Sequence, residues 1–281
     1  MGFFGEFSQW LDALLSTYIS DTLAKVAGAL TPAVVALGAV YVAVWGYLHC
    51  AGKIEEPFVA GLKRIGVLVL VIGVGLHLWL YQEVLVDTFF TAPGQLSAAI
   101  VGANDPVTII DQILFSGSDA GEALLAKAGI LDGLSFLAAG IVVYFLVGTT
   151  ALYVMFLLAL SKVALSILLA LGPLFIVMLL FKPTRHYFEA WIAQLSNYAL
   201  IAILTVLVES LLLQLISTAA NQAAAAGPGI TIALAVRVCL AAGLILLVLR
   251  QVMPMAAGLA RGISLTSFSV ASRAAAWGFG S

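Results

Sequence analysis

The chain is poor in charged residues, and this shortage narrows its class at once. Charged side chains make up 9% of the 281 residues, whereas soluble domains contain about 25%. Hydrophobic residues make up 63%, and several apolar runs approach the ~20 residues that a helix needs to cross a bilayer. A soluble globular protein is therefore excluded, and the composition predicts an all-α, polytopic membrane protein.

The sequence also lacks the patterns of catalysis, metal binding and nucleic-acid binding. Its formal net charge of −2 provides no basic surface for a polyanion. Cys50 and Cys239 have no motif spacing, and His49, His77 and His186 lie far apart along the chain. No nucleophile–base pair, phosphate loop, HExxH or CxxC pattern occurs. We therefore expect a protein that is not an enzyme and that uses no cofactor and no metal.

Apolar and polar stretches alternate along the chain and divide it into five regions. We expect an N-terminal amphipathic periplasmic or interfacial helix at 1–29, transmembrane helices one and two at 30–86, an acidic periplasmic loop at 87–132, a membrane domain at 133–252 and a cytoplasmic tail at 253–281. The five expected spans lie at about 31–49, 63–81, 134–160, 191–216 and 230–252.

The first region carries aromatic residues at helical spacing. Phe3, Phe7 and Trp10 recur on one side, and acids occupy much of the opposite face. Three acids interrupt the stretch, which favours a helix at the membrane surface or against a partner over a span. An anchor helix and a docking surface remain open alternatives. At Thr31–Pro32 a capping residue precedes a proline, which predicts that the first span begins there.

The region 87–132 is the largest polar insertion. It contains six acids and one base, a balance of −5. Its short apolar runs predict small helices. A solvated loop is one interpretation, but four apolar residues favour an exposed contact surface: Ile109, Ile110, Ile113 and Phe115.

The segment 163–181 contains Gly172–Pro173 in its middle, and a straight spanning helix is not expected there. Lysine and arginine accumulate on the cytoplasmic flanks of spans. If the segment does not cross, nine of the twelve bases share one side, Lys25 and Lys127 lie opposite, and Arg237 lies inside the membrane. If it crosses, four bases lie on one side of the membrane and seven on the other. The charges therefore predict five spans, with the N-terminus outside the cytoplasm and the tail inside.

The segment 163–181 is then re-entrant or bent. Irregular backbone at membrane depth is tolerated only where protein or water covers it. One alternative is that this segment faces a neighbouring subunit or an internal cavity. The other is that it is a buried helical break without a role in transport.

Glu209 and Arg237 are the two clear charges inside the predicted spans. Each lies seven residues, about 10 Å, from the outer end of its span, and a short connection joins the two helices. A lone charge at a helix centre costs roughly 2.5–3.5 kcal/mol. We therefore predict an intramembrane ion pair. Two alternatives stay open: Arg237 reaches the headgroups while Glu209 is protonated, or each residue faces another subunit.

Two classes of function remain, a subunit of a multi-protein secretion machine and a free-standing transporter. Many transporters show repeated halves and several intramembrane charges. This chain has an odd number of expected spans, no duplication and two charges inside its spans. These features favour the machine subunit.

Residues around the break also resemble a known family. The run Leu171–Ile176 is followed by Phe181, Thr184–Arg185, Phe188–Glu189, Trp191 and Asn197–Tyr198. This pattern is similar to that of the TrbL/VirB-type family, the polytopic inner-membrane subunits of bacterial type IV secretion systems. Gly172, Pro173, Arg185, Glu189 and Trp191 match the cytoplasm-proximal motif of that family.

The resemblance implies a homo-oligomeric ring in the bacterial inner membrane, with a periplasmic N-terminus and a cytoplasmic C-terminus. It implies as partners the minor pilin of the stalk, scaffold subunits, ATPases and membrane lipid, and a role in pilus assembly and in the passage of DNA or protein. Small residues let membrane helices approach closely, and five glycines are candidates for contacts between copies: Gly66, Gly73, Gly75, Gly140 and Gly148.

Overall fold

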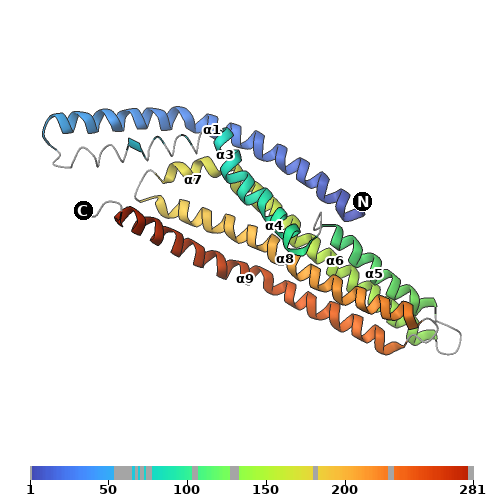
Figure 1. Ribbon diagram of the computed structural model, residues 1–281. Coiled ribbons are helices and arrows are strands. Elements are labelled where there is room, and N and C mark those ends of the chain that lie inside the picture. The colour runs from blue at the N-terminus through green and yellow to red at the C-terminus, as the bar shows by residue number, and fades with distance from the viewer. Residues whose placement is uncertain are drawn as a thin grey trace. The chain divides into compact units, whose positions relative to one another are not determined.

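The fold is made of helices alone in the part of the chain that the structure describes. The structure is a computed structural model that describes residues 2–53, 65–66, 69, 73, 78–102, 107–126, 133–179, 183–226 and 231–277. The elements are α1 (Phe3–Cys50), α3 (Leu78–Tyr81), the π-helix η1 (Gln82–Thr91), α4 (Ala92–Val101), α5 (Val107–Ala126), α6 (Gly133–Ala170), α7 (Gly172–Met178), α8 (Arg185–Ala226) and α9 (Ile232–Trp277) (Figure 1). The predicted all-α class is confirmed.

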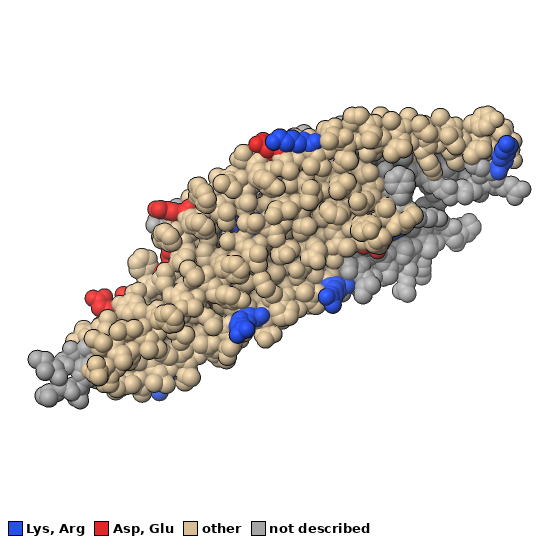
Figure 2. Space-filling view, turned by 180° about the vertical axis from the view of Figure 1, so that it is seen from behind, with Lys and Arg blue, Asp and Glu red and all other residues tan. Residues whose placement is uncertain are grey.

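Five helices within these residues are long and apolar enough to cross a membrane, as predicted. They are Phe3–Cys50, Gln82–Val101, Leu134–Ala170, Arg185–Ala219 and Ala235–Arg261. Charged side chains form only isolated spots on the face drawn in Figure 2. The second helix differs from the expected one, because Gln82–Val101 includes the start of the predicted acidic loop. Most of the expected span 63–81 lies outside the described residues.

Some residues that the sequence singled out also lie outside the described residues. These are Lys63, Arg64, Gly75, His77, Asp105, Lys127, Asp132, Phe181 and Lys182.

Helix α1 runs through Thr31–Pro32, so the predicted helix start at this position is wrong. Pro32 lies inside the helix, and the hydroxyl of Thr31 donates to the carbonyl of Ala27 at 2.6 Å instead of capping a new N-terminus. A proline within an apolar helix removes one backbone hydrogen bond, whereas a full break would leave several backbone groups without partners. Continuing the helix is the smaller cost in apolar surroundings.

Two other helices also run past their predicted ends. Helix α6 continues through Lys162 to Ala170, beyond the expected end of the third span at about 160. Helix α9 continues through Pro254 to Trp277, so most of the predicted tail at 253–281 is helical. A lysine keeps its backbone hydrogen bond and a proline removes only one, so neither residue is enough to end an apolar helix.

The chain divides into two compact units. Unit 1 comprises Met1–Ala13, Ala92–Val163 and Asn197–Leu259, and unit 2 comprises Leu14–Thr91, Ala164–Ser196 and Ala260–Ser281. The core of unit 1 consists of buried apolar side chains from α5, α6, α8 and α9, joined by Phe4 of α1.

Helix α5 corrects the prediction of an exposed surface within the acidic region. Ile109, Ile110 and Ile113 are buried in the core of unit 1, and only Phe115 is exposed. The three isoleucines share one face of a 20-residue helix with Ala120 and Leu124, which are also buried. The prediction of helix from the apolar runs is therefore confirmed here, and the prediction that this face is exposed is wrong.

Small residues bring α5 and α6 into close contact. A Cβ atom at Gly117 would lie 2.5 Å from Cγ1 of Val147, and one at Gly121 would lie 2.6 Å from Cε2 of Tyr144. A Cβ atom at Gly140 would lie 2.8 Å from Cδ2 of Leu125, so this glycine packs within the chain. Gly66, Gly73 and Gly148 have nothing described within 4 Å, and their contact with another copy stays a prediction.

We predict that Gly117→Ala destabilises unit 1, because the added methyl group meets the buried side chain of Val147. Overpacking of this kind costs about 1–3 kcal/mol. Gly243→Ala is the matched control, since nothing described lies within 4 Å of that position and alanine stabilises a helix over glycine by roughly 0.5–1 kcal/mol. Thermal unfolding in detergent should shift down for the first variant and up for the second. Equal shifts would contradict the close packing.

Candidate functional site

The predicted break at Gly172–Pro173 is a defined joint between two helices of unit 2. Helix α6 ends at Ala170, and α7 begins at Gly172 with Pro173 in its first turn. In an unbroken helix the amide of residue 173 would donate to the carbonyl of Leu169, but proline has no such hydrogen. The hydroxyl of Tyr81 donates to that carbonyl instead, at 2.6 Å.

Trp191 supplies a second donor to the same turn. Its indole Nε1 donates to the carbonyl of Leu168 at 2.9 Å. Its ring stacks on Phe175 of α7, with centroids 5.8 Å apart and planes at 11°, and also contacts Phe188 at 5.6 Å. Tyr81 and Trp191 are 1% and 2% exposed. Two neighbouring carbonyls at the end of α6 are thus satisfied by side chains from distant parts of the chain.

Gly172 is needed because Tyr81 comes so close. A Cβ atom at this position would overlap the hydroxyl and the ring of Tyr81. Glycine therefore provides the space, proline frees the carbonyl, and tyrosine occupies the space and bonds the carbonyl. Sequence reasoning did not single out Tyr81, since nothing in its local sequence indicates a partner 88 residues away.

The C-terminal end of α7 and the start of α8 have their own polar contacts. The hydroxyl of Thr184 donates to the carbonyl of Met178 at 2.8 Å, near the end of α7. Arg185 and Glu189 form an exposed pair across one turn, with Nε and Oε1 3.2 Å apart. Exposed pairs of this kind contribute less than about 1 kcal/mol. Arg185 and Glu189 are thus better suited to contact a partner than to hold the joint.

These observations bear on the alternatives for the segment 163–181. The segment is bent: it comprises the last turns of α6, the joint and α7. The carbonyl of Leu169, which Pro173 leaves without its backbone donor, and the neighbouring carbonyl of Leu168 both accept hydrogen bonds from within unit 2. That arrangement favours a buried helical joint over a stretch of backbone that lines a cavity. Whether the segment crosses the bilayer stays a prediction.

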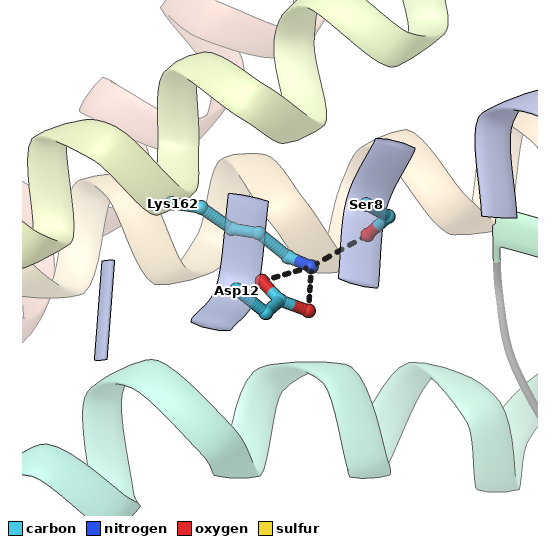
Figure 3. A network of polar contacts seen from close by, with 3 residues as sticks. All are labelled: Ser8, Asp12 and Lys162. Carbon is cyan, nitrogen blue, oxygen red and sulfur yellow. Dashed lines mark hydrogen bonds and ion pairs between the residues drawn. The ribbon is translucent and has the colours of Figure 1, made fainter. Parts of the chain in front are cut away.

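A separate polar cluster lies in unit 1, where Lys162 of α6 meets the start of α1. Its Nζ lies 2.7 Å from each carboxylate oxygen of Asp12 and 3.0 Å from Oγ of Ser8 (Figure 3). Ser8 is buried, and the Lys162 and Asp12 side chains are 26% and 40% exposed. This partly buried charge cluster attaches the first turns of α1 to α6.

A second contact fixes the beginning of α1. The carboxylate of Asp111 on α5 accepts hydrogen bonds from the amides of Phe4 and Gly5, at 3.2 and 3.3 Å. These amides belong to the first turn of α1, where backbone N–H groups have no acceptor within their own helix and carry a partial positive charge. A Cβ atom at Gly2 would overlap this carboxylate. We call the contacts of Asp111 and Lys162 with α1 the N-terminal clamp.

The two charges predicted to pair inside the membrane have different surroundings. Glu209 on α8 is fully buried in unit 1, and Arg237 on α9 is exposed. The pairing stays a prediction. No group of three or more histidine, cysteine or acidic residues within the described ranges could hold a metal ion.

The chain was compared with known proteins. A model of the TrbL/VirB6 plasmid conjugal transfer protein family matches residues 38–252. The "Type IV secretion system protein VirB6" of Bartonella quintana (strain Toulouse) is 24% identical over 214 residues, which cover 72% of this chain and 63% of that protein. The VirB6 protein of Bartonella henselae is 24% identical over 225 residues, or 76% and 67%.

A third relative, the VirB6 protein of Brucella abortus biovar 1, is 28% identical over 193 residues, which cover 63% of this chain and 54% of its own length. The chain thus spans between about half and two thirds of these relatives. The matched range 38–252 contains Tyr81, the joint and Trp191, but it begins after the first residues of the N-terminal clamp.

We predict that Tyr81→Phe destabilises the joint, because it leaves the buried carbonyl of Leu169 without the hydroxyl donor. An unsatisfied buried group of this kind costs about 1–3 kcal/mol. The matched control is Tyr187→Phe, at an exposed tyrosine of α8. The readouts are the thermal unfolding temperature in detergent and the rate of proteolysis between α7 and α8. If both variants behave alike, the Tyr81 hydrogen bond does not hold the joint.

Proposed function

Because this chain belongs to the TrbL/VirB6 plasmid conjugal transfer protein family, we propose that it is an inner-membrane subunit of a bacterial type IV secretion system. In this role it supports pilus assembly and the translocation of DNA or protein substrates as part of the channel. The family match over residues 38–252 carries the proposal. The five long apolar helices support a multi-pass position in the membrane.

The arrangement of the joint supports a scaffold or channel subunit over a free-standing transporter. Transporters commonly bind substrates where broken helices present open backbone groups. Here the carbonyls of Leu168 and Leu169 are already bonded to Trp191 and Tyr81. The broken helix is therefore better suited to pack rigidly against other subunits than to bind a substrate.

The partners that we propose are the minor pilin of the stalk, the scaffold subunits and the ATPases, around a homo-oligomeric ring of this chain in membrane lipid. The exposed start of α8 offers one surface for a partner on the cytoplasmic side, with Arg185, Tyr187 and Glu189 accessible beside the buried Trp191. A surface with both charges and an aromatic ring suits a protein partner.

The test is affinity purification of the tagged chain from native membranes in mild detergent, followed by mass spectrometry. We expect several copies of the chain together with a stalk pilin and a secretion ATPase. A double variant, Arg185→Ala with Glu189→Ala, should lose the cytoplasmic partners, whereas Lys25→Ala, at an exposed base on α1, should keep them. A monodisperse chain that co-purifies with no other subunit and takes up solute in proteoliposomes would favour the transporter.

We further propose that the N-terminus is periplasmic and the C-terminus cytoplasmic. The support is the division of the bases, nine on one side against two on the other. Reporter domains that are active only outside the cytoplasm should work when fused after residues 110 and 225 and fail when fused after residue 185. Strong activity at 185 would mean that the segment 163–181 crosses the membrane.

The pair of Glu209 and Arg237 is proposed to couple α8 to α9 in the assembled membrane protein. The support is their matched distance from the outer ends of the predicted spans and the cost of a lone charge there. Glu209→Gln and Arg237→Gln should each lower membrane abundance, and the exchange of Glu209→Arg with Arg237→Glu should restore part of it. An exchange that is no better than the sum of the single changes contradicts the pair.

A further inference from the structure

A cleft of about 430 Å³ opens in unit 2 between α1 and the π-helix η1. Its described walls come from residues 16–20 of α1 and from Gln82–Thr91 of η1, so both walls belong to the same unit. Pockets of about 300–1,000 Å³ hold small-molecule ligands. The cleft is therefore large enough for one long side chain and larger than a single ion requires.

Hydrogen bonds fix the start of η1 within unit 2. The side-chain amide of Gln82 donates to Oγ of Ser20 at 3.3 Å, and this hydroxyl donates to the carbonyl of Ser16 at 3.0 Å. On the preceding residue, the hydroxyl of Tyr81 donates to the carbonyl of Leu169 at 2.6 Å. The two walls are thus tied to each other, and the cleft exists without a partner.

The π-helix η1 keeps its side chains accessible. It has 10 residues, whereas π-helices are mostly single turns, which occur frequently at functional sites. Five of its residues are apolar, and a helix of this composition usually buries its apolar face. None of the ten residues is buried. Unit 2 by itself therefore leaves η1 open to a partner.

Glu83 and Asp87 place two carboxylates along the cleft. They lie four residues apart on η1, and both are exposed. Neither carboxylate has a hydrogen-bond or ionic partner among the residues that the structure describes, and the described walls contain no lysine or arginine. Neighbouring negative charges without a counter-charge attract a cation and repel an anion. The charge of the cleft thus selects a cationic partner.

The apolar part of the lining indicates which kind of cation fits. Ile19, Val86 and Phe90 line the cleft together with the carboxylates. Calcium and magnesium take about six to eight oxygen ligands, and an apolar wall supplies none. An arginine side chain matches both parts, because its alkyl stem packs on apolar surface and its guanidinium bonds carboxylates through paired donors. Arginine also suits the site better than lysine, since guanidinium groups stack on aromatic rings such as that of Phe90.

We propose that this cleft, here called the acidic cleft, is a docking site for an arginine side chain of a protein partner. The guanidinium lies against Glu83 and Asp87, and the alkyl stem lies along Val86 and Phe90. Charge complementarity, the volume of the cleft and its apolar wall support this occupant. The proposal goes beyond the role in secretion and does not depend on it, because an isolated peptide tests it.

The test is saturation-transfer NMR, which detects weak binding, on the full chain in mild detergent. The probe is the peptide Gly-Gly-Arg-Gly-Gly with blocked termini. The matched control contains citrulline in place of arginine, which keeps the shape and lacks the charge. We expect transfer to the arginine side chain and an affinity about tenfold lower for the citrulline peptide, or roughly 1.4 kcal/mol. Equal binding of the two peptides would refute recognition of the guanidinium.

Matched variants of the chain separate the acidic cleft from general surface charge. Glu83→Gln with Asp87→Asn removes both carboxylates and should weaken binding of the arginine peptide about tenfold. Asp119→Asn with Glu122→Gln removes two exposed charges from α5, outside the described walls of the cleft, and should leave binding unchanged. If the two double variants weaken binding equally, overall charge holds the peptide and the assignment of a docking site is wrong.

A variant that keeps both carboxylates makes the test decisive if the double variant at 83 and 87 does not fold. Val86→Trp enlarges a side chain of the apolar wall, so it narrows the cleft and should also abolish binding. Unchanged binding by Val86→Trp would contradict a site inside the cleft.

Two competitors test the other cationic occupants. If magnesium chloride displaces the peptide and sodium chloride at the same ionic strength does not, the cleft is a metal site. If phosphatidylethanolamine displaces the peptide and phosphatidylglycerol does not, the cleft holds a lipid headgroup. Either result would overturn the proposal, and we expect neither lipid to compete.

Discussion

In an apolar environment every backbone carbonyl needs a donor, and this requirement governs the joint at Gly172–Pro173. Proline takes away the donor that the carbonyl of Leu169 would use in a continuous helix. The hydroxyl of Tyr81 replaces it at 2.6 Å, and the indole of Trp191 bonds the preceding carbonyl. The bend in the chain is stable because side chains from two other segments complete its hydrogen bonds.

Unit 1 meets the matching requirement at the start of α1, where backbone amides need acceptors. The amides of Phe4 and Gly5 donate to the carboxylate of Asp111, and the ammonium group of Lys162 pairs with Asp12. At both places a polar group of one helix is thus paired with a group from another helix. These pairings orient the helix faces, and through them they decide which residues contact the surroundings.

The amino-acid sequence predicts the helical class, the number of long apolar helices and the bend at Gly172–Pro173, because composition and the chemistry of proline act locally. It does not predict Tyr81 as a partner of the break, because that contact joins residues 88 positions apart. The acids of the region 87–132 are typical of a solvated loop, yet Asp119 and Glu122 lie on the outer face of α5, and the buried Asp111 bonds the start of α1. Thr31–Pro32 suggested a helix start because a cap and an internal proline look alike without the tertiary structure.

The fit between Gly172 and Tyr81 also constrains how this sequence can drift. Any side chain larger than hydrogen at position 172 would occupy the space of the tyrosine ring and hydroxyl, so position 172 can enlarge only if position 81 shrinks. A smaller residue at position 81 loses the hydroxyl, and the carbonyl of Leu169 then has no hydrogen-bond donor, because residue 173 is proline. We therefore expect the three positions to be energetically coupled, so that the effect of a substitution at one depends on the residues at the other two, although some ninety residues separate Tyr81 from Gly172 and Pro173.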